Sequence, residues 1–187
     1  MKNILLIMLV LFIGCTPKQE ENHDEGDYDS KSPSYSFVEG HAPVWEQATA
    51  QIMELADAMP EDMYTYSPHD SVRTFAEQLV HIGGSSVVIA NLFLKDIQPG
   101  TPPEMDIAAM TKEEIKSMVK GGLDQTWEIM SSMSDEQLDE EIKSFAGNTM
   151  TRREGMMLVH DHLTNHKAKA NLYVRISGNN PPSYRYY

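Results

Sequence analysis

Cysteine and basic residues are both scarce in this chain, and each scarcity excludes a class of protein. Cys15 is the only cysteine among 187 residues, which rules out an internal disulfide and a cysteine-based metal site. Lys and Arg number 15 against 28 Asp and Glu, so the formal net charge is −13. Because no basic stripe is available to displace counterions from a phosphate backbone, we expect no nucleic-acid partner.

The sequence near the N-terminus also lacks an apolar run long enough for a membrane span. The uncharged stretch from Ile4 to Ile13 is shorter than the about 20 residues that a helix needs to cross a bilayer. It follows Lys2 and leads to Gly14-Cys15, so a basic residue, an apolar stretch and a small residue stand in the order of a secretory signal. We therefore expect residues 1–14 to be a signal peptide.

The end of this stretch, Phe12-Ile13-Gly14-Cys15, resembles a bacterial lipobox, in which a large apolar residue, a smaller one and Gly or Ala precede an obligatory Cys. The resemblance implies that Cys15 is acylated and anchors the protein to a membrane of the bacterial cell envelope, at the periplasmic face or the cell surface. Phe12 departs from the pattern, which most often has Leu. The alternative is an ordinary secreted protein with a free thiol.

Residues 15–40 are polar and acidic and carry no periodic apolar face, so we interpret them as a disordered tether. The segment Lys18-Gln19-Glu20-Glu21 resembles an acidic signal that sends some lipoproteins to the cell surface. A solvated spacer would have the same composition.

Beyond the tether the sequence predicts an all-α domain over residues 41–187, folded as an antiparallel four-helix bundle with short connections. Thr111, Ser134 and Thr151 are each followed three residues later by Glu or Gln, the spacing of a capping box that begins a helix. Pro43 suits a first turn. The expected helices cover about 43–58, 71–94, 111–133 and 151–177, with a short helical segment over 134–142.

Three histidines fall on the inward faces of these helices. His162 and His166 are four residues apart, so their imidazoles lie one turn apart on one face. His81 shares its direction with Val88 and Leu92. The three rings can meet around one divalent metal ion and leave an open position, or they can be hydrogen-bonded core residues. His160 points nearly opposite to His162 and is left out.

Glu77 precedes His81 by about one turn and is the single carboxylate that we nominate as a catalytic base or as an orienting partner for a histidine. No Ser or Cys nucleophile motif accompanies it. The residues alone therefore do not define a reaction.

The chain resembles the DinB or YfiT-like family. The segments that carry the resemblance are Ser71–Gly84, His162–Ala170, Arg175–Gly178 and Pro181-Pro182. The resemblance implies a four-helix bundle and a divalent-metal site that maps onto His81, His162 and His166. Many members have Arg-Gly-Gln after the last histidine, whereas this chain has Lys167-Ala168-Lys169, so nothing about substrate is transferred from that stretch.

Characterised members of the family include transferases and isomerases that use a small cellular thiol, and most members have no assigned reaction. Because such thiols are cytoplasmic, an exported member is less suited to that chemistry. We expect either a metal-dependent hydrolase or transferase acting on a small molecule, or a non-catalytic lipoprotein that the metal stabilises. The metal can be Zn, Ni, Fe or Mn. The sequence does not decide between a monomer and a homodimer.

Overall fold

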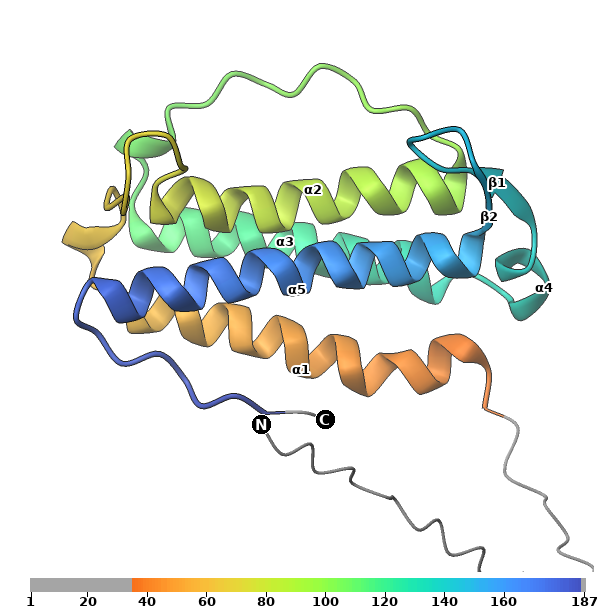
Figure 1. Cartoon of the computed structure of the whole chain (residues 1–187), viewed down its shortest axis with the longest axis horizontal. Coiled ribbons are helices and arrows are strands. Elements are labelled where there is room, and N and C mark those ends of the chain that lie inside the picture. Colours follow the sequence, from red (N-terminus) through yellow and green to blue (C-terminus); the bar gives the residue numbers. More distant parts are fainter. Residues whose placement is uncertain (1–34, 186–187) are drawn as a thin grey trace, which may run out of the picture. The chain divides into compact units, whose positions relative to one another are not determined.

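The structure, a computed structural model, describes residues 35–185, in which four long helices lie side by side (Figure 1). They are α1 (Phe37–Ala58), α2 (Phe75–Lys95), α3 (Lys112–Ser131) and α5 (Arg152–Ile176). Shorter elements connect them: η1 (Glu61–Met63), η2 (Ile107–Ala109), α4 (Asp135–Leu138) and the strands β1 (Glu141–Lys143) and β2 (Thr149–Thr151). The expectation of a mostly helical protein is confirmed.

Each of the four long helices begins at a capping box, in which a Ser or Thr side chain and a Glu side chain each accept a backbone N–H of the first turn. The boxes at Thr111 and Thr151 were predicted. The box at Ser36 and Glu39 was not, and α1 therefore begins six residues before Pro43, which lies inside the helix. Residues 37–40, assigned to the tether from the sequence, form its first turn.

The helix directions differ from the antiparallel arrangement with short connections expected from the sequence. Residues 96–111 pass along the outside and return to the end where α2 began, so α3 runs parallel to α2 (Figure 1). The contacts of Lys112, the first residue of α3, agree with this direction. Its ammonium donates to the carbonyls of Asp57 and Met59, so α3 begins beside the end of α1. Periodicity identifies the buried face of a helix but not its direction, which explains the error.

A two-stranded hairpin replaces the second half of the short helix expected over residues 134–142. The helix α4 ends at Leu138, and β1 pairs antiparallel with β2 in a register that places Ile142 opposite Met150. Gly147, with φ of +80°, makes the turn, a conformation that favours glycine. The β-branched residues of Thr149-Met150-Thr151 were the available signal for a strand.

One apolar core fills the space between the helices. The residues of the inward face of α1 and of its C-cap are all buried: Trp45, Ala48, Ile52, Leu55 and Met59. The prediction was wrong for Val88 on α2, which is 41% exposed and places that flank of the helix at the surface. None of the helices in residues 35–185 combines the length and apolarity needed to span a membrane.

Candidate metal centre

The helices α2 and α5 bring the three predicted histidines together. His81 stands on α2, and His162 and His166 stand one turn apart on α5, which runs antiparallel to α2 beside it (Figure 1). One ring nitrogen from each residue lies within 4.8 Å of the others. We call His81, His162 and His166 the histidine cluster.

The rings of the histidine cluster are in direct contact. The ring centroid of His81 lies 4.3 Å from that of His166 and 5.2 Å from that of His162, and the two rings on α5 are 4.5 Å apart. Three neutral imidazoles so placed form a donor set suited to zinc, nickel, iron or copper. The residues present therefore fit the divalent metal that was expected from the sequence.

Burial keeps these rings in the form that binds metal. It lowers the pKa of His81 and of His166 to about 4, and nearby positive charges add to the effect. The pKa of His162 is lowered by the same causes, partly opposed by Asp161. Only neutral imidazole coordinates a metal, and all three rings are neutral at neutral pH.

Two polar side chains of α2 contact the outer nitrogens of the cluster, and the sequence analysis missed both. Ser85 donates its hydroxyl to the carbonyl of His81, and its Oγ lies 3.3 Å from Nδ1 of His162. The oxygen can therefore accept Nδ1–H and leave Nε2 of His162 free. The buried amide of Gln78 contacts Nδ1 of His166. Both residues lie within about one turn of His81, which was the available signal.

The other two residues considered from the sequence are placed elsewhere. Glu77 is exposed and uses its carboxylate to accept the backbone N–H of Thr74 at 2.7 Å, which completes the capping box of α2. His160 lies outside the cluster and makes an edge-on ring contact with His41, 5.1 Å between centroids. Cys15 and the expected signal peptide lie outside the described residues.

Comparisons with known proteins identify the family of this chain. The DinB family matches residues 41–187. An uncharacterised protein of Bacillus subtilis, YjoA, is 28% identical over 127 residues, which cover 67% of this chain and 80% of YjoA.

Two solved structures share the fold. The crystal structure of the DinB-like YjoA superposes with a TM-score of 0.65 at 25% identity, covering 79% of this chain and 97% of that one. A DinB-like protein of Bacillus cereus gives a TM-score of 0.63 at 16% identity over the same shares of the two chains. On the match that spans residues 41–187, the chain belongs to the DinB family.

Proposed function

We propose that this protein is a metalloprotein that holds one divalent ion on His81, His162 and His166 within the four-helix bundle typical of DinB proteins. The observation that carries the proposal is the meeting of three ring nitrogens from two helices within 4.8 Å. Three protein ligands leave a further coordination position for a small molecule. We infer that the protein uses this position as a metal-dependent hydrolase or transferase.

The chain's own residues have defined tasks in this proposal. The three imidazoles bind the ion, while Ser85 fixes the tautomer of His162 and Gln78 holds the ring of His166 in its orientation. Zn, Ni, Fe and Mn are all candidates for the ion. A bound divalent ion supplies Lewis-acid activation of a substrate oxygen or of water.

Positive charges beside the histidine cluster favour an anionic substrate. Arg73 and Lys169 are close enough to contribute to lowering the pKa of all three histidines. This is a local excess of positive charge in a chain whose formal net charge is −13. A small molecule with a carboxylate or phosphate would be attracted to this point of the surface.

A non-catalytic role is the second candidate, and the position of Glu77 favours it. That carboxylate is occupied by the backbone of Thr74, so it is not free to act as the general base that we nominated from the sequence. A metal that only joined α2 to α5 would stabilise the fold and would need no base. In this case the coordination sphere would be closed by a fourth ligand.

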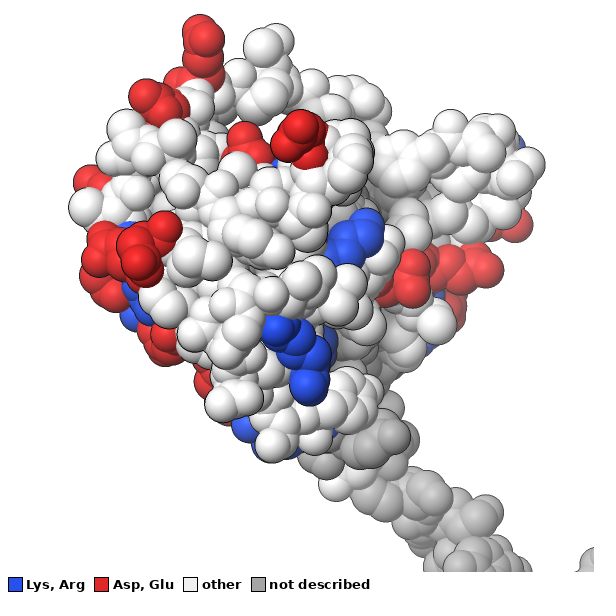
Figure 2. All heavy atoms as spheres, turned by 60° about the vertical axis from the view of Figure 1, so that its left-hand side comes forward, with Lys and Arg blue, Asp and Glu red and all other residues white. Residues whose placement is uncertain are grey.

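We place the protein on a membrane of the bacterial cell envelope, held by an acylated Cys15, because an apolar stretch and a lipobox-like segment precede this residue. Nucleic acid is not a proposed partner. Figure 2 shows one face of the domain on which acidic side chains gather in groups and basic side chains form no continuous band. A homodimer is not required by any step of the proposal.

Metal analysis of the purified protein tests the proposal. The protein is stripped of metal, offered Zn, Ni, Fe or Mn in turn near neutral pH, dialysed and analysed by mass spectrometry. We expect one ion per chain, and we expect His81→Ala, His162→Ala and His166→Ala each to lose it. His160→Ala is the matched control, since it removes a histidine of the same helix outside the cluster. A wild-type protein that retains none of the four metals overturns the proposal.

The same samples distinguish the two candidate roles. A metal that stabilises the fold without catalysis would raise the melting temperature and would not exchange ligands with small anions. An open site would bind a coordinating anion such as azide. This binding would change the spectrum of the cobalt-substituted protein.

A further inference from the structure

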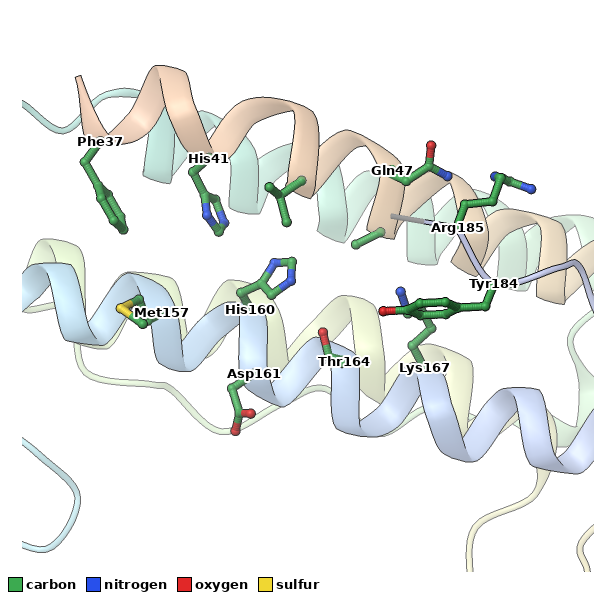
Figure 3. Close-up of a pocket in the computed structure, with 12 residues that line it drawn as sticks. Phe37, His41, Gln47, Met157, His160, Asp161, Thr164, Lys167, Tyr184 and Arg185 are labelled. Atoms are coloured by element: carbon green, nitrogen blue, oxygen red, sulfur yellow. The ribbon is translucent and has the colours of Figure 1, made fainter. Parts of the chain in front are cut away.

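A cavity of about 580 Å³ opens between α1 and α5 (Figure 3). Its residues on α5, from Met157 to Lys167, lie on the face of the helix opposite to His162 and His166, because successive residues turn by about 100°. The cavity is therefore separate from the histidine cluster. Its volume lies in the range of about 300–1,000 Å³ that is usual for sites of small organic ligands.

The walls of this cavity combine apolar and polar surface. Phe37 and Val44 on α1 and Met157 on α5 supply apolar wall, and Tyr184 of the C-terminal segment lies across the opposite end (Figure 3). The C-terminal segment is held in place where Gln51 donates its amide to the carbonyl of Arg185 at 2.8 Å. The space is therefore bounded by three separate parts of the chain.

Two buried ring nitrogens in this cavity lack a partner. His41 and His160 point toward each other from α1 and α5, 5.1 Å between ring centroids and 82° between ring planes (Figure 3). Nε2 of His41 and Nδ1 of His160 are shielded from solvent, and neither has a hydrogen-bond partner among residues 35–185. Buried polar atoms are normally hydrogen-bonded, so this wall of the cavity holds two polar atoms that the protein leaves unsatisfied.

The ammonium of Lys167 supplies a positive charge to the same space. It is half-buried, donates to Oε1 of Gln51 at 3.1 Å and lies over the ring of Tyr184. Among the described residues no carboxylate forms an ion pair with it. Arg185, also in the lining, is already paired with Glu54 at 2.6 Å.

The remaining charged group of the lining is Asp161, which points away from His160 in Figure 3. Burial and the nearby ammonium of Lys167 lower the pKa of His160, so the ammonium and this imidazole belong to the same part of the cavity. A partly buried cation without a counter-ion, beside two unsatisfied imidazoles, attracts one anionic group.

We infer that this cavity binds a small organic carboxylate with an apolar body. The carboxylate pairs with Lys167, and the apolar body lies along Phe37, Val44 and Met157 and against the rings of His41 and His160. The cavity binds this ligand independently of the metal, because its lining includes none of the three metal-binding histidines.

Calorimetric titration of the full protein with sodium octanoate tests the inference, with octanamide as the uncharged probe of the same length. We expect octanoate to bind one per chain and octanamide to bind at least about tenfold more weakly. Lys167→Met should reduce the octanoate affinity by a similar factor and leave that of octanamide nearly unchanged. Lys95→Met, which removes an exposed lysine elsewhere, should behave as wild type.

A second measurement on wild-type protein covers the case in which Lys167→Met does not fold. Octanoate should shift the nuclear magnetic resonance signals of the His41 and His160 rings, assigned with His41→Gln and His160→Gln. The octanoate affinity of His81→Ala should equal that of wild type, which separates this site from the proposed metal centre. Equal affinities for octanoate and octanamide, or ring signals that do not respond to octanoate, overturn the inference.

Discussion

The side-chain amide of Gln78 on α2 contacts Nδ1 of His166 on α5. With its nitrogen toward the ring, as in this structure, the amide donates and the ring carries its own proton on Nε2. If the amide turns over, its nitrogen gives up the hydrogen bond that it donates to the carbonyl of His166 at 3.3 Å, its oxygen accepts from Nδ1–H, and the lone pair of Nε2 is free. The amide of Gln78 and the tautomer of His166 are therefore coupled, and the second arrangement is the one that binds metal through Nε2.

We predict from this coupling that Gln78→Leu weakens metal affinity by roughly 10- to 100-fold, the usual cost of removing a hydrogen-bond partner behind a ligand histidine. Gln78→Glu should preserve the affinity, because a carboxylate can only accept from Nδ1–H. Competition with a chromogenic chelator measures both. Leu and Glu variants of equal affinity would show that the hydrogen bond has no effect on metal binding.

Ser85 and Ser86 provide a matched pair of variants for the same site. Both are on α2 and both donate to a carbonyl one turn earlier, but only Ser85 also contacts His162. Ser85→Ala should therefore lower the affinity for the metal, while Ser86→Ala should alter only the stability of the fold. Chelator competition and thermal melting, run on both variants, separate the two effects.

Acid should destabilise the metal-free protein well before its carboxylates titrate. Burial lowers the pKa of His41, His81 and His166 to about 4, and it also lowers the pKa of His160 and His162. In the unfolded chain these rings titrate near 6.5. Between these pH values the unfolded state binds more protons than the folded state, so the free energy of unfolding falls as pH falls. The stability that these histidines contribute is fully present only above a pH of about 6.5.

Urea unfolding at pH 7.5, 6.5 and 5.5 checks this dependence, with the midpoint expected to fall at each step below 6.5. His41→Gln should make the midpoint less sensitive to pH, because one of the titrating groups is gone. Carboxylates contribute little in this range, since they titrate near 4. A midpoint that is constant from pH 7.5 to 5.5 would contradict the assigned pKa values.

The long helices and the histidine cluster could be predicted from the sequence because both depend on local spacing. A stripe of apolar residues defines a helix face, and His162 and His166 share that face by their separation of four residues. The direction of α3 could not be predicted in this way. It depends on where residues 96–111 lead the chain, which is a long-range property.

Glu77 belongs to a capping box whose pattern is present in the sequence. Thr74-Phe75-Ala76-Glu77 has the same Thr and Glu spacing as the boxes recognised at Thr111 and Thr151. Reading it in this way would have placed the start of α2 correctly and assigned the carboxylate to the backbone. Gln78 and Ser85 had only a weaker signal, their position within about one turn of His81, because the rings that they contact belong to another helix.

Acylation at Cys15 is tested by Cys15→Ser. Because no other cysteine can take its place, we expect the variant to leave the membrane fraction or to remain unprocessed. Fractionation, immunoblotting and metabolic labelling with a fatty acid measure this. Unchanged processing and membrane attachment in the variant would rule out the lipid anchor.

The backbones of α2 and α3 lie close together at Gly83 and Gly122. A Cβ on Gly122 would lie 2.7 Å from the carbonyl oxygen of Gly83 and 2.8 Å from its carbonyl carbon, and these are backbone atoms that cannot turn aside. Gly122→Ala should therefore separate the two helices and cost about 1–3 kcal/mol of the free energy of unfolding.

The neighbouring Gly121 is the matched control, since no atom lies within 4 Å of a Cβ there. Gly121→Ala should stabilise the protein by about 0.5–1 kcal/mol, because alanine loses less backbone entropy in a helix. Urea unfolding of both variants decides the matter: equal midpoints, or a Gly122→Ala protein more stable than wild type, would mean that the helices are not in backbone contact at this point.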